Sequence, residues 1–398
     1  MTSSATSSFS PPRQALRFVL IAQFLSALAD NALLFAAIAL LKTQLYPSWS
    51  IPVLQEFFVA AYILLAPFAG PLADGLPKGR VMLISNAMKL LGAGAMLAGL
   101  NPFIAYGLVG LGAAAYSPAK YGILSELVPA EGLVKANGAM EASTIAAILL
   151  GALAGGKASD WNVTGTLIGI VALYAAAGLV NLFIPATGAQ LRPIPGVRAQ
   201  VRTFLQSFKL LWGDSPARLS MLGTSAFWGA GATLRFLLVA WVPAALAITS
   251  NAIPAYLNAS TAVGIVVGAA LASRYIKIEN ATRAIWAGVA LGALVAALAA
   301  IGSLSMAYVL TALVGIAGGF FVVPLNALLQ ERGHTLVGAG SAIAAQNLVE
   351  NLLMMTMVGV YTGLDHAGLA PGLTAVIFGL GFAGACVLLL RVARRPAC

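Results

Sequence analysis

Long apolar runs recur along almost the whole chain, and short segments with most of the polar and charged residues separate them. A run of about 20 apolar residues is the length that a helix needs to cross the hydrocarbon core of a bilayer. The pattern therefore predicts an all-α membrane protein. The twelve predicted transmembrane helices cover residues 17–41, 52–73, 81–100, 103–126, 133–156, 163–186, 219–244, 253–275, 284–303, 306–330, 338–362 and 370–390.

The polar segments divide these spans into two sets of six. Residues 17–186 are predicted to form an N-terminal six-helix bundle, and residues 219–390 a C-terminal one. Residues 187–218 are rich in Arg, Lys and Pro, and we expect a basic cytoplasmic linker along the membrane surface. The small, polar residues of segment 1–16 predict a disordered cytoplasmic tail, and residues 391–398 a basic cytoplasmic tail.

The two halves resemble each other. SPAKYGILSEL (117–127) and VPLNALLQERG (323–333) each have a proline seven or eight residues before a glutamate. KANGAMEASTIAAILLG in span five corresponds to GAGSAIAAQNLVENLLM in span eleven. A repeat of six spans predicts two bundles around a central cavity, which is the arrangement of the major facilitator superfamily.

One loop carries a more specific resemblance. GPLADGLPKGR (70–80) is similar to the loop motif between spans two and three of major facilitators, although Pro77 stands where glycine is usual. The resemblance implies that Asp74, Lys78 and Arg80 help to lock the inner gate. The alternative is an aspartate and two cations that cap a short turn. The corresponding C-terminal loop, GAALASRYIKIENATR, lacks the aspartate.

Composition and charge agree with a membrane protein. Hydrophobic residues make up 60% of the chain and charged residues 9%, whereas an ordinary soluble domain has about 25% charged residues. With a cytoplasmic N-terminus, 17 of the 22 Lys and Arg residues fall in cytoplasmic segments, so basic loops predict that both termini are cytoplasmic. The net charge of +10 is explained by this asymmetry, and no nucleic-acid partner is expected.

Charged side chains also occur inside the predicted spans. A charge at the bilayer centre costs at least about 2.5 to 3.5 kcal/mol, so these residues should face the protein interior and neutralise one another. The charged residues within the spans are Asp30, Lys89, Lys120, Glu141, Arg235 and Glu350.

Three of these charges, Asp30, Arg235 and Glu350, lie near the middle of spans one, seven and eleven, and we expect them to bind substrate in the cavity. Lys120 could join them or extend toward the cytoplasmic surface. Lys89 and Glu141 are assigned to an intramembrane charge network, in which they could pair within the N-terminal half. The alternative for all six is that they only hold helices together. Amides next to Asp30 and Glu350 extend the predicted site to Asn31, Gln346, Asn347 and Asn351.

Other patterns have simpler explanations. GALAGGK (151–157) has the spacing of a phosphate-binding loop, but Ala158 replaces the required Ser or Thr and a predicted membrane span precedes it. We therefore expect no ATP hydrolysis. Gly264 with Gly268, and Gly288 with Gly292, are spaced for close helix packing. Two histidines, two cysteines and no glycine-x-serine-x-glycine motif argue against an enzyme, a metal site and a cofactor.

Five stretches carry a closer resemblance: AQFLSALADNALLFAAIALL, AAYSPAKYGILSEL, KANGAMEASTIAAILLG, GTSAFWGAGATLRFLLVAWVP and GGFFVVPLNALLQERG. They look like the lysophospholipid transporter family of Gram-negative inner membranes, a branch of the major facilitators. The resemblance implies movement of lysophosphatidylethanolamine and lysophosphatidylglycerol from the outer to the inner leaflet. It also implies a separate cytoplasmic acyltransferase/acyl carrier protein synthetase as partner.

A zwitterionic head group would then meet charges of both signs. In this hypothesis Arg235 and Lys120 receive the phosphate, while Asp30 and Glu350 balance the charge of Arg235 and meet the amine. The expected protein is a monomer that works without ATP. The rival hypothesis is a proton-coupled exporter of amphipathic drugs or cations, with Asp30 or Glu350 as the proton carrier.

Overall fold

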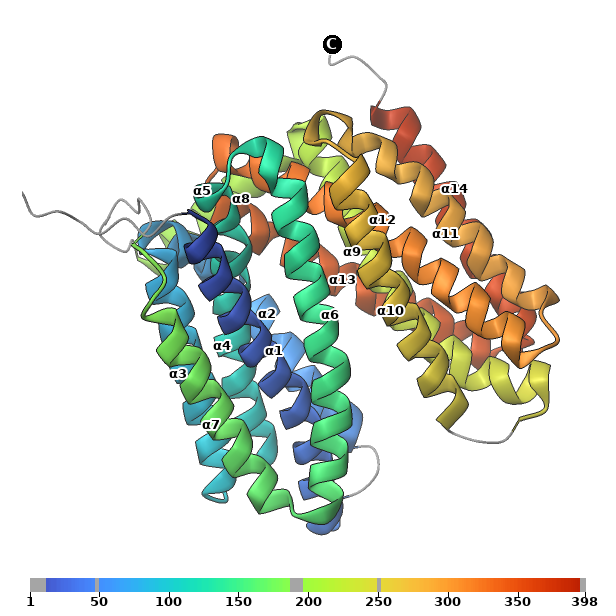
Figure 1. Cartoon of the computed structure of the whole chain (residues 1–398), viewed down its shortest axis with the longest axis horizontal. Helices are drawn as coiled ribbons and strands as arrows, with labels where there is room; N and C mark the ends of the chain where they lie inside the picture. The colour runs from blue at the N-terminus through green and yellow to red at the C-terminus, as the bar shows by residue number, and fades with distance from the viewer. Residues whose placement is uncertain (1–11, 47–49, 187–195, 249–251, 394–398) are drawn as a thin grey trace, which may run out of the picture.

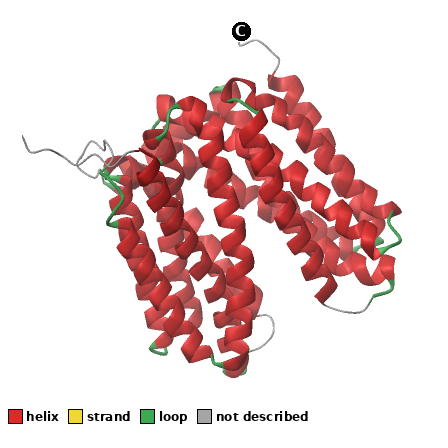
Figure 2. Cartoon of the chain, in the orientation of Figure 1, coloured by secondary structure: helices red, strands yellow, loops and turns green. Residues whose placement is uncertain are grey.

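The computed structural model describes residues 12–46, 50–186, 196–248 and 252–393 (Figure 1), and all regular elements in these residues are helices (Figure 2). The first half contains α1 (Pro12–Thr43), α2 (Ser50–Gly75), α3 (Lys78–Leu97), α4 (Pro102–Gly122), α5 (Leu124–Leu127), α6 (Ala130–Trp161) and α7 (Val163–Asn181). After α8 (Val197–Gly213), the second half contains α9 (Ser215–Leu246), α10 (Ala252–Tyr275), η1 (Ile278–Ala284), α11 (Ile285–Ala297), η2 (Leu298–Ala300), α12 (Leu304–Leu336), α13 (Ala339–His366) and α14 (Pro371–Ala393).

The predicted fold class is confirmed. Twelve of these helices correspond to the twelve predicted spans. Ten helical segments among the described residues are long and apolar enough to cross a membrane. The other two membrane helices, α3 and α4, contain Lys89 and Lys120 and lie within the same bundle.

Helix α1 begins earlier than the sequence pattern predicts. It starts at Pro12, so residues 12–16 of the predicted disordered tail are helical, while residues 1–11 lie outside the described part of the chain. Proline is favoured in the first turn of a helix, where its missing N–H is not needed, and Arg, Gln, Ala and Leu then continue the helix well. Apolar periodicity alone could not locate this start, because the first turn is polar.

The predicted linker also contains a helix. α8 occupies most of segment 187–218, of which residues 187–195 lie outside the described residues. Asp214 then ends α8 and caps α9, because its side chain accepts a hydrogen bond from the backbone N–H of Ala217 at 3.0 Å.

Packing repeats between the halves. α1 packs on α6 as α9 packs on α13, and α2 packs on α4 as α10 packs on α12. The two bundles meet at the end where α5 and α8 lie and diverge toward the other end (Figure 1). We call the end where they meet the closed end; there α2 contacts α13, and α6 contacts α10.

Helices α10 and α12 pack with their backbones in contact. A Cβ atom on Gly264 would lie 2.2 Å from the carbonyl oxygen of Ala312, and one on Gly315 would lie 2.0 Å from that of Thr261. Real Cβ atoms do not approach so closely, so only glycine fits at these positions. The predicted packing role of Gly264 and Gly268 is confirmed.

Candidate functional site

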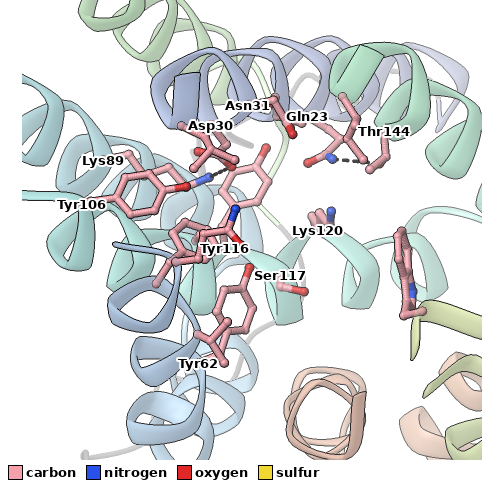
Figure 3. A pocket seen from close by; sticks show the side chains of 18 of the residues that line it. Gln23, Asp30, Asn31, Tyr62, Lys89, Tyr106, Tyr116, Ser117, Lys120 and Thr144 are labelled. Atoms are coloured by element: carbon pink, nitrogen blue, oxygen red, sulfur yellow. Dashed lines mark hydrogen bonds and ion pairs between the residues drawn. The ribbon is translucent and has the colours of Figure 1, made fainter. Parts of the chain in front are cut away.

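A cavity of about 430 Å³ lies between the two bundles. Residues of α1, α2, α3, α4 and α6 line it from the N-terminal bundle, and residues of α9 and α13 from the C-terminal bundle. Its polar and aromatic lining consists of Gln23, Asp30, Asn31, Gln55, Phe58, Tyr62, Lys89, Tyr106, Tyr116, Ser117, Lys120, Thr144, Trp228 and Arg235 (Figure 3). Four of the predicted substrate-binding residues, Asp30, Asn31, Lys120 and Arg235, are therefore in this cavity.

The Asp30 carboxylate is already occupied by partners from its own bundle. Lys89 Nζ lies 2.7 Å from Oδ2, and the Tyr174 hydroxyl donates to Oδ1 at 2.7 Å (Figure 3 shows the ion pair). Lys89 Nζ also donates to Ser26 Oγ at 3.0 Å, and only 1% of Lys89 is exposed. A buried ion pair needs this kind of additional hydrogen bonding to compensate for desolvation. Asp30 and Lys89 thus neutralise each other across α1 and α3.

This pairing corrects the sequence-based alternative that Lys89 pairs with Glu141. Glu141 instead accepts hydrogen bonds at its Oε1 from the Tyr121 hydroxyl at 2.8 Å and from Asn326 Nδ2 at 3.0 Å. Its Oε2 atom is buried and has no hydrogen-bond partner. Asn326 belongs to α12, so Glu141 links the two bundles and does not line the cavity.

Two cations of the cavity have no anionic partner. Neither Lys120 nor Arg235 forms an ion pair with any described residue. Lys120 Nζ lies 4.6 Å from the centre of the Tyr121 ring, and an aromatic ring attracts a cation only weakly. Arg235 is exposed and lines the cavity. The predicted neutralisation of Arg235 by Asp30 and Glu350 does not occur in this structure. Both cations are available to an anion that enters the cavity.

The predicted polar strip of α13 lies beside the cavity and does not line it. Gln346 Nε2 donates to Glu350 Oε1 at 2.7 Å, to Asn326 Oδ1 at 2.9 Å and to Thr224 Oγ1 at 3.0 Å. The strip touches the cavity wall through Ser117, whose hydroxyl donates to Asn347 Oδ1 at 3.3 Å. The Asn351 side chain donates to the Asn347 carbonyl oxygen at 2.7 Å.

The loop motif lies at the closed end and binds the opposite bundle. Asp74 accepts hydrogen bonds from the backbone N–H groups of Gly340 and Ser341 at 2.7 and 2.8 Å, and from the Ser341 hydroxyl at 2.8 Å. These donors belong to the N-terminus of α13, where a carboxylate is stabilised by the helix dipole. Lys78 forms an ion pair with Glu126 and lies 3.7 Å from Asp74. Arg80 is exposed and forms no ion pair with the described residues, so it does not take part in this contact.

A second polar contact holds the bundles together farther from the loop. The side-chain amides of Asn137 on α6 and Gln330 on α12 donate to each other, both at 2.8 Å, and both residues are buried. Together with the Asp74 contact, these bonds close the end of the cavity that lies toward α8.

Sequence reasoning missed the aromatic wall of the cavity. Tyr62, Tyr106 and Tyr116 line the cavity together with Asp30 and Lys89, and Lys89 Nζ lies 4.8 Å from the centre of the Tyr116 ring. Tyrosine is common within apolar spans, so nothing in the sequence marks these positions as lining a cavity. Gln23 does carry a polar signal, since it lies seven residues before Asp30 and therefore on the same face of α1.

Comparison with known proteins gives the family. The sequence profile of the Major Facilitator Superfamily matches residues 19–357. The lysophospholipid transporter LplT of Salmonella arizonae is 55% identical over 381 residues, covering 95% of this chain and 96% of that protein. LplT of Yersinia pestis (strain Pestoides F) is 58% identical over 350 residues, covering 86% of this chain and 85% of that protein.

Solved structures share the fold at low identity. The human organic anion transporter MFSD10 superposes with a TM-score of 0.79 at 15% identity, covering 97% of this chain and all of that one. The Major Facilitator Superfamily transporter FucP in the outward conformation gives 0.75 at 13% identity, covering 97% of this chain and 100% of that one. The chain belongs to the Major Facilitator Superfamily, a superfamily of multi-pass membrane transporters and not of enzymes, and within it to the family of the lysophospholipid transporters.

Proposed function

We propose that this protein carries lysophospholipids, namely lysophosphatidylethanolamine and lysophosphatidylglycerol, from the outer to the inner leaflet of the bacterial inner membrane. Identities of 55 and 58% to proteins named lysophospholipid transporters support the substrate class. One observation from the structure supports it most strongly: Lys120 and Arg235, which form no ion pair with the described residues, face a cavity that also holds the neutralised pair of Asp30 and Lys89.

The phosphate of the lipid would bind between Arg235 and Lys120. A guanidinium can bind two phosphate oxygens at once, and a lysine adds a second charge-assisted hydrogen bond. The amine of the ethanolamine form would interact with Asp30, next to Asn31, by sharing the carboxylate with Lys89. Glu350 and the amides of the α13 strip (Gln346, Asn347 and Asn351) would reach the head group when the bundles move.

The acyl chain would lie along the apolar part of the cavity. Leu34, Phe58, Val59, Ile148 and Met354 line it, and they come from both bundles. A lipid with one chain exposes less apolar surface than one with two, so a cavity of about 430 Å³ with an apolar side fits a head group and the adjoining part of a single chain.

Alternating access would move the lipid without ATP hydrolysis. The Asp74 contact with α13, together with Lys78 and Glu126, would serve as the gate at the closed end and would break when this end opens. Basic segments at this end support a cytoplasmic orientation, with both termini inside. Reacylation by a separate cytoplasmic acyltransferase/acyl carrier protein synthetase would keep the gradient of lysolipid directed inward, and the transporter would act as a monomer.

The experiment uses the full chain in sealed liposomes without a proton gradient. Labelled lysophosphatidylethanolamine is added to one leaflet, and albumin extracts what remains there at successive times. We expect protein-dependent movement that falls at least about tenfold in Arg235→Ala, because a tenfold change corresponds to about 1.4 kcal/mol, less than one charged hydrogen bond can contribute.

A matched control is Arg274→Ala, which removes an exposed arginine from the end of α10, far from the cavity lining. This variant should transport as the wild type does. Wild-type liposomes that behave as empty ones would refute the proposed function. Movement that requires a proton gradient would favour the rival exporter instead.

A further inference from the structure

Helix α8 has an inner face that is packed on both bundles. Its buried residues are Gln200, Phe204, Ser207 and Leu211. Phe204 and Leu211 belong to an apolar cluster with Ala69 of α2 and Ala345 of α13. This face is therefore occupied by the protein itself and is not available to a partner.

The contacts of the inner face fix the depth of α8 relative to the membrane. Ala66 and Ala69, which share the cluster, lie in the last three turns of α2, a helix that is long and apolar enough to span a bilayer. α8 consequently lies beside the end of a spanning helix, at the level where hydrocarbon gives way to lipid head groups.

The side of α8 next to the inner face is apolar and exposed. Leu205 and Trp212 are 54% and 40% exposed, while Phe208, which lies between them along the helix, is half-buried and also packs against the apolar cluster. The rings of Phe208 and Trp212 stack with centroids 5.7 Å apart. Tryptophan with an aliphatic neighbour is typical of the membrane–water interface, where an aromatic ring meets both phases.

Three cations adjoin this apolar strip. Arg198, Arg202 and Lys209 are all exposed, and their spacing brings them to one side of the helix, next to Leu205 and away from the buried face. The sequence of α8 contains no acidic residue. Asp214, which follows α8, is already bound by Arg332, whose Nε donates to Oδ1 at 3.2 Å. Within the described residues, none of the three cations has an acidic partner.

We propose that α8 is an interfacial helix that binds anionic phospholipid head groups through Arg198, Arg202 and Lys209, with Leu205 and Trp212 inserted among the adjoining acyl chains. An apolar strip beside a basic strip matches a membrane surface, in which negative head groups lie directly above hydrocarbon. Each basic residue near an anionic surface strengthens binding roughly fivefold. This surface is separate from the cavity and does not depend on the transported substrate.

The test is hydrogen–deuterium exchange of the full-length protein in nanodiscs. One set of discs contains phosphatidylcholine alone, and the other an equal mixture of phosphatidylcholine and phosphatidylglycerol. We expect the α8 amides to exchange at least about threefold more slowly in the anionic discs, since even one bound cation would stabilise the helix by more than this factor. High salt should remove most of the difference by screening.

A charge-matched pair of variants identifies the surface. Protection by anionic lipid should be lost in the triple variant Arg198→Gln/Arg202→Gln/Lys209→Gln. It should be retained in the control variant Arg274→Gln/Lys277→Gln/Arg283→Gln, which removes three exposed cations from the segment between the end of α10 and the end of η1. Equal exchange of α8 in both kinds of disc would overturn the proposal. So would full protection in the first variant, or protection only when an acidic soluble protein is added. Because exchange is measured without substrate, failure here leaves the transport assay unaffected.

Discussion

The Asp30–Lys89 pair and Arg235 lie on opposite sides of the cavity and differ in their partners. On the N-terminal side, Asp30 and Lys89 are paired, hydrogen-bonded and enclosed by aromatic rings. On the C-terminal side, Arg235 borders the same cavity without any anionic partner among the described residues. A charge inside the membrane can therefore support the fold or remain available to a ligand, and its partners, not its position along the helix, determine which.

The largest expected effect is the loss of stability when Lys89 is replaced. Lys89→Ala leaves the Asp30 carboxylate without its cation in a largely buried site, and breaking a buried pair in this way costs about 3 to 5 kcal/mol. We expect a clearly lower unfolding midpoint in detergent, measured by circular dichroism. Asp30→Asn/Lys89→Met removes both charges and should recover most of the loss. Unchanged stability of Lys89→Ala would show that the pair does not support the fold.

Arg235 should give the opposite result. Arg235→Ala removes no ion pair, so the free energy of unfolding should stay within about 0.5 kcal/mol of the wild-type value while lysolipid movement falls. Arg235→Lys should retain part of the transport, because lysine keeps the charge but cannot bind two phosphate oxygens in one plane. If Arg235→Ala destabilises the protein as much as Lys89→Ala does, the distinction between the two sides fails.

The contribution of Tyr174 to the Asp30 site can be measured separately from that of Lys89. The Tyr174 hydroxyl donates to Asp30, and Tyr174→Phe should lower stability by about 1 kcal/mol, the usual contribution of one such bond. Tyr106→Phe is the matched control, because it removes a nearby tyrosine hydroxyl, on the cavity wall, that makes no hydrogen bond to Asp30. The same unfolding assay decides, and equal effects of the two variants would argue against a specific role of Tyr174.

The smallest expected effect lies outside the cavity, at Asp214. Partial burial raises the pKa of Asp214, but hydrogen bonds from Arg332 and from the Ala217 N–H outweigh it and lower the pKa below its usual value. A carboxyl with a lowered folded-state pKa contributes stability above its unfolded pKa, and loses that contribution as the pH falls through the folded value.

Asp214→Asn should therefore destabilise the protein by less than about 1 kcal/mol at neutral pH, because the pair is partly exposed. The difference from wild type should shrink as the pH is lowered below about 4, and parallel unfolding curves across pH measure it. A difference that grows in acid would have the wrong sign for this explanation.

The fold could be predicted from the sequence because the bilayer imposes it. A continuous apolar run of about 20 residues can satisfy its own backbone groups in hydrocarbon only as a helix, and the twelve apolar runs correspond to twelve helices. The ends of the helices were harder to predict than the helices themselves, because a polar first turn such as that of α1 has no apolar pattern. α8 had a signal in the spacing of Gln200, Phe204, Ser207 and Leu211, which repeats at helical intervals through an otherwise polar linker.

The site was only partly predictable for a different reason. Sequence identifies which charges lie inside the membrane, but the choice of partner depends on how each helix is rotated about its axis. The sequence offered Glu141 as the partner of Lys89 and Arg235 as that of Asp30, whereas in the structure α1 and α3 both pack on α7, and Asp30 meets Lys89 and Tyr174 there. The rotation of α13 likewise places Glu350 away from the cavity lining, beside its neighbour Gln346 on the same helix.

The contact between α10 and α12 restricts how the transporter can move. Because main-chain atoms meet at Gly264 and Gly315, neither helix can slide along the other without a steric clash. The two helices must therefore move together as one rigid body. In the alternating access that we propose, rearrangement would therefore occur at contacts between the bundles, such as Asp74 against Gly340, and not between α10 and α12. The pivot would then lie between the bundles, and the two joined helices would keep their arrangement as the C-terminal bundle moves.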